Sequence, residues 1–141
     1  MITEDYVSFE TAKLLKEKGF DEPCDRVYMH DGKCVCAPNF MEGENFVDND
    51  DIDAVKRYDE SNWIDYIQGE YAYLCPSISL ATKWLREVHN IHIDIAYNMG
   101  YFPICISTKT NDTIPYIPMG KPFTYEKACE VAIKYCLEYL I

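Results

Sequence analysis

The sequence predicts an α+β fold in a single domain of 141 residues. Three stretches repeat apolar residues at helical spacing, and two pairs of short stretches alternate in polarity around turn residues. Because short connections favour antiparallel pairing, we expect one small sheet of about four strands, in two hairpins, with three helices packed on it. The predicted order is α-β-β-loop-α-β-β-α. Hydrophobic residues make up 48% of the chain, which is sufficient for one core.

The first helix is predicted over residues 9–18. Ser8 precedes it as an N-cap, since its hydroxyl can accept a hydrogen bond from a free amide of the first turn. Gly19 follows at the position where a left-handed residue ends a helix. Phe20 is then placed to pack on Leu15, as in a Schellman motif. The segment therefore carries both its start and its stop signal.

A hairpin is predicted next, with strands over 26–29 and 34–37. The dipeptide Asp31-Gly32 is typical of a two-residue type I′ loop. With that loop, four apolar side chains form one face of the hairpin in two cross-strand pairs. The pairs are Met29 with Cys34 and Val27 with Cys36.

Residues 38–65 form a long acidic connection, with a short helix expected over 52–58. Nine of its 28 residues are Asp or Glu, against two basic side chains, and long connections in small domains are often functional. Residues 48–53 resemble a calcium loop for its first three positions only, because Ile52 and Asp53 stand where that loop requires a ligand and a glycine. We therefore expect a solvated charge run. Its candidate partner-binding carboxylates are Asp48, Asp50, Asp51 and Asp53.

The second half begins with a helix that starts at Pro76 or Ile78 and ends at His89. Strands over 91–97 and 102–108 follow, because apolar and polar residues alternate there. The apolar stripe predicted for the helix comprises Ala81, Trp84, Leu85 and Val88.

The chain after the second hairpin predicts two further segments. A stretch with prolines at 115, 118 and 122 is expected to be an edge strand or an extended loop. The last helix is predicted over 125–140, with Thr124 as its N-cap. Cys129 and Cys136 lie seven residues apart on its apolar side, so we expect both in the core.

The formal net charge of −11 disfavours several classes of partner. A field of this sign repels nucleic-acid backbones and anionic lipid, so we expect neither nucleic acid nor membrane as a direct partner. A secretory signal peptide begins with basic residues, whereas this chain has Glu4 and Asp5 there. No stretch of the sequence approaches the ~20 apolar residues that a membrane helix needs. Seven cysteines, an odd number, favour reduced thiols in a cytoplasmic protein.

Two groups of residues are candidate metal ligands. The first surrounds the first hairpin, where the spacing of the last two cysteines is one residue short of a zinc pair, and core packing is the favoured interpretation. Its members are Cys24, His30, Cys34 and Cys36. The second comprises His89, His92 and Asp94, for which a helix-terminal histidine and two solvated side chains are the alternative. We predict no metal and no cofactor.

The sequence contains no phosphate-binding glycine loop, serine elbow or helical zinc-protease motif. A Cys–His pair is the remaining route to nucleophilic chemistry. Cys75 is the best-placed thiol for it, because the N-terminus of a following helix lowers a thiol pKa. We expect a protein without catalytic activity and keep a small Cys/His-dependent enzyme or metal protein as an alternative.

Twelve tyrosines are many for a chain of this length. Tyrosine suits partly buried interfaces, because it joins apolar area to a polar tip, although it equally suits the rim of a small core. Six tyrosines lie in or near predicted loops: Tyr66, Tyr71, Tyr73, Tyr97, Tyr101 and Tyr116. The first three, beside the acidic connection, are assigned to a partner-binding surface.

Three helical segments, 8–20, 76–90 and 125–141, resemble small uncharacterised proteins of prophages and mobile elements in gut anaerobic bacteria. The resemblance covers about a third of the chain and lies on helices. It brings no catalytic motif, and it implies a cytoplasmic phage accessory factor.

These observations favour a non-enzymatic phage or mobile-element accessory protein, monomeric or homodimeric, that binds another protein. One alternative is an acidic decoy, in which the carboxylates of residues 42–65 imitate DNA phosphates and occupy a DNA-binding protein. The other alternative is a small enzyme or metal protein. That protein would use Cys75, His89, His92 or Asp94.

Overall fold

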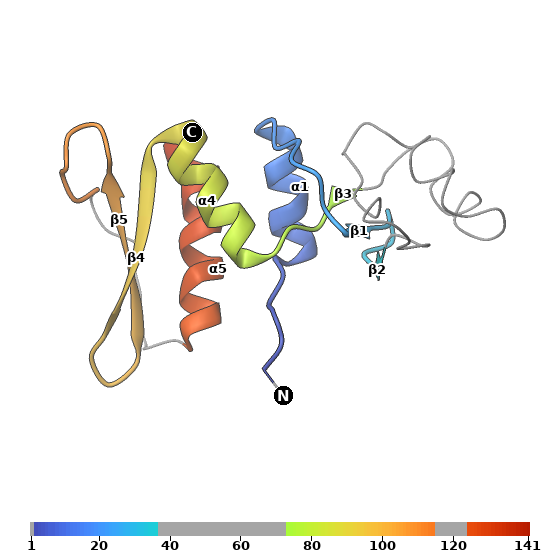
Figure 1. Cartoon of the computed structure of the whole chain (residues 1–141), viewed down its shortest axis with the longest axis horizontal. Helices are drawn as coiled ribbons and strands as arrows, with labels where there is room; N and C mark the ends of the chain where they lie inside the picture. Colours follow the sequence, from blue (N-terminus) through green and yellow to red (C-terminus); the bar gives the residue numbers. More distant parts are fainter. Residues whose placement is uncertain (1, 37–72, 115–123) are drawn as a thin grey trace, which may run out of the picture. The chain divides into compact units, whose positions relative to one another are not determined.

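The computed structural model describes residues 2–36, 73–114 and 124–141, and within them the chain has an α+β fold (Figure 1). The chain divides into two compact units. One unit comprises Met1–Val7 and Ser77–Ile141, and the other comprises Ser8–Pro76. The predicted α+β class is confirmed, but the described strands form two separate sheets rather than one.

Helix α1 (Phe9–Glu17) opens the unit Ser8–Pro76 with the predicted caps. The Ser8 hydroxyl accepts a hydrogen bond from a first-turn amide at 3.3 Å. At the other end Gly19 has a φ of 89°, and the Phe20 amide donates to the Leu15 carbonyl at 2.9 Å. This is a Schellman motif, and it directs the Phe20 side chain into the core, where it is buried.

Three short strands form the sheet of this unit in the order β2-β1-β3, with antiparallel pairing throughout. They are β1 (Arg26–Tyr28), β2 (Cys34–Cys36) and β3 (Tyr73–Leu74). The last strand lies between the acidic connection and Cys75, at a place where no strand is predicted.

The register of the β1–β2 hairpin differs by one residue from the predicted register. Val27 pairs with Val35, and Tyr28 pairs with Cys34. A shift of one residue moves a side chain to the opposite face of a sheet. Cys34 therefore shares a face with Arg26 and Tyr28 instead of with Val27. This corrects the predicted apolar face of Val27, Met29, Cys34 and Cys36.

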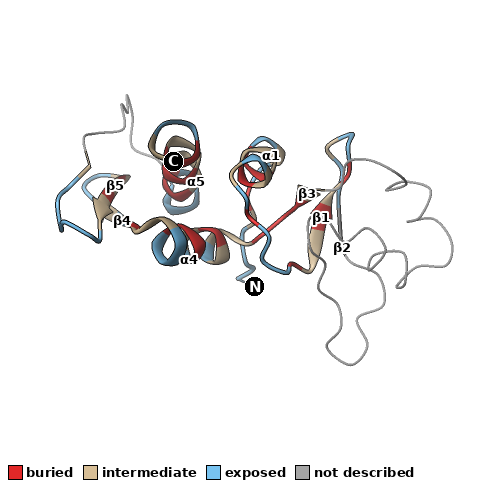
Figure 2. Ribbon diagram, turned by 90° about the horizontal axis from the view of Figure 1, so that it is seen from above, coloured by how far each residue is buried: buried red, intermediate tan, exposed pale blue. Residues whose placement is uncertain are grey.

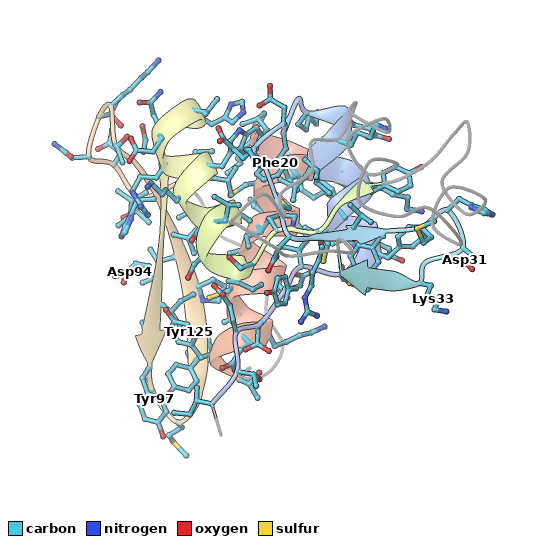
Figure 3. The ribbon with its side chains drawn as sticks, turned by 45° about the vertical axis from the view of Figure 1, so that its right-hand side comes forward. Phe20, Asp31, Lys33, Asp94, Tyr97 and Tyr125 are labelled. Atoms are coloured by element: carbon cyan, nitrogen blue, oxygen red, sulfur yellow. The ribbon has the colours of Figure 1, made fainter. Side chains whose placement is uncertain are left out.

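The loop of this hairpin explains the shift. The Gly32 amide donates to the Met29 carbonyl at 2.9 Å, while the Met29 amide donates to the Lys33 carbonyl at 2.9 Å. Gly32 has a φ of 89°, so the connection is a three-residue loop with a left-handed glycine rather than a two-residue type I′ loop. The Asp31 carboxylate accepts a hydrogen bond from the Lys33 amide at 2.9 Å, at the turn labelled in Figure 3.

The other unit contains one hairpin and two longer helices. Its elements are α4 (Ile78–His89), β4 (Ile91–Tyr97), β5 (Tyr101–Ser107), α5 (Tyr125–Tyr135) and the π-helical turn η2 (Cys136–Leu140). Ser77 and Thr124 cap the two helices, each accepting a hydrogen bond from the amide three residues later. Both α4 and α5 lie on the same side of the β4–β5 hairpin (Figures 1 and 2).

The pairing within this hairpin identifies its covered face. Ile93 pairs with Cys105 and Ile95 with Pro103, and both of these β5 residues are buried. The Cys105 Sγ lies 3.8 Å from the Sγ of Cys136 in the last helical turn, so this face meets the helices. Figure 2 colours buried residues red, and both α4 and α5 carry such residues.

The apolar stripe of α4 is narrower than predicted. Ala81, Trp84 and Leu85 are buried, but 53% of Val88 is exposed. Val88 is close to the end of the helix, where Asn90 turns the chain into β4 with a φ of 59°. The predicted helix 52–58 and the prolines at 115, 118 and 122 lie outside the described residues. In the part of the chain that is described, no helix has the length and apolar character needed to cross a membrane.

Candidate functional site

Exposed aromatic side chains gather at the turn end of the β4–β5 hairpin. The ring centroids of Tyr97 and Tyr101 are 5.0 Å apart, and those of Tyr101 and Tyr125 are 5.5 Å apart, both in edge-to-face geometry. Tyr97 is 70% exposed and Met99 is 88% exposed. We call the four residues Tyr97, Met99, Tyr101 and Tyr125 the hairpin tip.

The strand register explains why these rings meet. Tyr97 pairs with Tyr101, two residues beyond the Ile95–Pro103 pair, so both rings lie on the face that meets the helices. Tyr125 is the first residue of α5, placed there by its cap. The hairpin tip thus continues the covered face of the sheet beyond the helices and into solvent, as the positions of Tyr97 and Tyr125 in Figure 3 show.

Met99 stands at the centre of the turn in a left-handed conformation, with a φ of 57°. The Asn98 amide closes the turn by donating to the Gly100 carbonyl at 2.8 Å. An unbranched apolar side chain in this conformation costs about 1 kcal/mol and gains no burial in return. Such strain at an exposed position is an indication of function. Sequence reasoning did not select Met99 or Tyr125, although a Met between Asn and Gly in a turn is a usable signal.

The predicted partner-binding residues are only partly described. Tyr66, Tyr71 and the four aspartates Asp48, Asp50, Asp51 and Asp53 lie outside the described residues. Tyr73 lies in β3, where its ring packs edge-on against Phe9 at 5.7 Å. The Lys16 ammonium lies 5.4 Å from the centre of the same ring. Tyr73 is thus half-buried within its own unit.

The structure does not group the three candidate ligands His89, His92 and Asp94 together. The His89 ring packs on Trp84 at 4.6 Å, and its buried Nε2 has no hydrogen-bond partner among the described residues. Burial lowers the pKa of His89, which favours neutral imidazole over the charged form expected at a helix dipole. Asp94 is exposed and accepts a hydrogen bond from the Ile95 amide. Among the described residues, no three His, Cys, Asp or Glu side chains are grouped to hold a metal.

The hairpin cysteines are also dispersed. Cys24 is buried and its Sγ donates to the Glu22 carbonyl at 3.4 Å, while His30 is exposed in the turn. The Sγ of Cys34 lies 3.8 Å from the Sγ of Cys75. The sequence prediction did not include this contact, because it places Cys34 on the apolar face.

The Cys34–Cys75 contact joins an exposed thiol to a buried one. The pKa of Cys34 is lowered from 9.0 to about 7, chiefly by its hydrogen-bonding contact with the Cys75 thiol, with Arg26 adding both charge and a hydrogen bond. Burial and the carboxylate of Asp25 oppose this shift. The pKa of Cys75 is raised, first by its hydrogen-bonding contact with Cys34 and then because burial disfavours its thiolate. The low-pKa thiol is therefore Cys34, which corrects the prediction made for Cys75.

A second thiol pair lies in the other unit. Cys105 and Cys136 are both buried, and their Sγ atoms are also 3.8 Å apart. The hydrogen bond from Cys136 lowers the pKa of Cys105, burial opposes it, and the pKa of Cys136 is raised. Cys129 is buried as predicted.

Comparison with known proteins does not assign the chain to a family. No family model matches it, and neither a curated protein nor a solved structure is significantly similar to it. The function is therefore inferred from the side chains alone.

Proposed function

We propose that this protein is a non-enzymatic accessory protein that acts by binding another protein, and that the hairpin tip is its contact surface. The observation that carries the proposal is the cluster of Tyr97, Met99, Tyr101 and Tyr125, of which three are about half or more exposed. Tyr and Met are enriched in the centres of protein interfaces, and aromatic residues there often supply most of the binding energy.

The charge distribution favours an apolar contact at this surface. Residues 77–141 carry six acidic and six basic side chains, so the whole net charge of −11 falls within residues 1–76. A partner that met the hairpin tip would therefore meet a neutral half of the chain, and burial of tyrosine and methionine would supply the affinity. The acidic decoy hypothesis concerns the other half of the chain. The cytoplasmic location and the prophage origin implied by the resemblance belong to the same proposal.

The ring contacts also support a preorganised surface. Tyr97 and Tyr125 each rest on Tyr101, so two exposed rings are held in place before any partner arrives. Side chains that are ordered in advance lose less conformational entropy on binding. Met99 remains adaptable beside them, because its unbranched side chain has three rotatable bonds.

The test is a comparative pull-down from a bacterial lysate with quantitative mass spectrometry. The double variant Tyr97→Ser/Met99→Ser should retain about tenfold less partner than the wild type, since removal of two interface anchors costs more than ~1.4 kcal/mol. Tyr139→Ser is the matched control, because Tyr139 is 69% exposed at the C-terminal turn, almost as much as Tyr97. Equal retention by all three proteins, or no retained protein, would contradict the proposal.

A further inference from the structure

We propose that Cys34 and Cys75 form a redox-active thiol pair, in which Cys34 attacks a low-molecular-weight disulfide and Cys75 then closes an intramolecular disulfide. This activity is separate from the proposed binding function. It lies in the unit Ser8–Pro76, whereas the hairpin tip lies in the other unit, so either proposal can fail without the other.

The exposure of Cys34 and the closeness of its sulfur to that of Cys75 support the proposal. Of the six cysteines whose side chains the structure describes, Cys34 alone is exposed. Its sulfur already lies 3.8 Å from that of Cys75, although 41 residues separate the two along the chain. A disulfide requires about 2.0 Å, so the two sulfurs need to approach by roughly 1.8 Å. Within the described residues, β2 is a three-residue strand paired only with β1, which favours so small a shift.

The surroundings assign one role to each sulfur. The Arg26 guanidinium faces Cys34 and stabilises its thiolate, which is the form that attacks a disulfide. The Asp25 carboxylate raises the pKa of Cys34, but the opposite effect of Arg26 is larger. Cys75 is fully buried near Tyr28 and Cys24, so it cannot meet an oxidant in solution. Its sulfur lies 3.8 Å from that of Cys34, the exposed thiol, and this is the position of a resolving thiol.

The chemistry balances in two exchange steps. The Cys34 thiolate attacks one sulfur of the disulfide RSSR, the S–S bond breaks, and RS⁻ leaves and takes a proton from water. Cys75 then loses its proton to solvent and attacks the Cys34 sulfur of the mixed disulfide, and the second RS⁻ leaves and is protonated. Two protein thiols are oxidised to one disulfide, while RSSR is reduced to two RSH.

The buried pair provides an internal comparison. Cys105 and Cys136 have the same sulfur separation, yet both are buried, and no basic side chain of the described residues contributes to the pKa of either. If proximity were sufficient, both pairs would oxidise at similar rates. If an exposed attacking thiol is also required, only Cys34 and Cys75 will oxidise in the folded protein.

The experiment exposes the reduced full-length protein to glutathione disulfide near neutral pH, blocks the remaining thiols with a maleimide, and maps the cysteines by mass spectrometry. The proposal expects an intact mass lower by two hydrogens and a Cys34–Cys75 cross-linked peptide. That peptide should form at least about tenfold faster than any Cys105–Cys136 cross-link. Reduction should restore both thiols.

Variants identify the two steps. Cys75→Ala and Cys75→Ser should stop the reaction at a glutathione adduct on Cys34, whereas Cys34→Ser should give neither adduct nor cross-link. Cys105→Ala should leave the Cys34–Cys75 cross-link unchanged. Because the main result comes from wild-type protein, a variant that fails to fold does not remove the test. A stable glutathione adduct in the wild type, a bond from Cys34 to any other cysteine, or no reaction at Cys34 would overturn the proposal.

Discussion

The two thiol pairs of this protein share a sulfur separation of 3.8 Å and differ in almost everything around it. Cys105 and Cys136 lie between a sheet and a helix, where both are sealed from solvent. Cys34 lies on a short strand, exposed and beside Arg26, with only its partner Cys75 buried. The comparison shows that distance between sulfurs does not by itself define a reactive site. Access and a nearby positive charge distinguish reactive thiols from packing thiols.

The largest expected effect is a loss of stability from a cavity beside the buried pair, Cys105 and Cys136. Leu137 is fully buried and follows Cys136 along the chain, so Leu137→Ala should destabilise the protein by about 2–5 kcal/mol through the cavity that it leaves. Chemical denaturation measures this loss. Native-state labelling of Cys105 and Cys136 should become faster, while labelling of Cys34 should not change. Tyr139→Ala, an exposed site in the same turn, is the control and should alter neither quantity.

The next effect concerns the loop that positions Cys34. Gly32 and Gly19 both have a φ of 89°, so alanine at either site should cost about 1–2 kcal/mol of stability. A Cβ at Gly32 would also stand 3.4 Å from the Phe9 ring, whereas a Cβ at Gly19 meets no atom within 4 Å. Only Gly32→Ala should slow formation of the Cys34–Cys75 disulfide, measured as cross-link yield. Equal yields in the two variants would show that the loop does not set the position of Cys34.

The smallest effect is electrostatic. Arg26→Gln removes a positive charge that stabilises the Cys34 thiolate, so the pKa of Cys34 should rise from about 7 toward 9.0. The pH at which alkylation of Cys34 reaches half its maximal rate measures this, and it should move upward. Arg26→Lys should give a smaller rise, because it keeps the charge but not the planar guanidinium. Lys33→Gln changes an exposed neighbour in the turn and should leave the profile in place.

Local signals made much of the fold predictable. Ser8 and Thr124 are recognisable as helix caps from the sequence, because each hydroxyl acts within its own first turn. The two strands of the second hairpin follow from an equally local alternation of polarity, although β5 begins at Tyr101, one residue earlier than predicted. Such features depend on neighbours along the chain, so a single sequence is enough to find them.

The thiol site could not be predicted in the same way. The dipeptide Asp31-Gly32 suits loops of two or three residues, and the choice between them decides which face Cys34 takes. Its partner Cys75 is brought near by the pairing of β3 with β1, a contact distant in sequence. The hairpin tip was partly predictable, because Tyr97 and Tyr101 flank a turn. Tyr125 joins them only through the packing of α5 on the sheet.

The measurement that tests the account most directly is the alkylation rate of each cysteine in the native protein as a function of pH. The account predicts that Cys34 reacts first, with its rate reaching half of its maximum near pH 7. Cys105 should react at least about 100-fold more slowly, because a local opening that costs ~3 kcal/mol lowers its reactive population by that factor. Labelling of Cys105 as fast as that of Cys34, or a Cys34 midpoint near 9.0, would contradict the distinction between the two pairs.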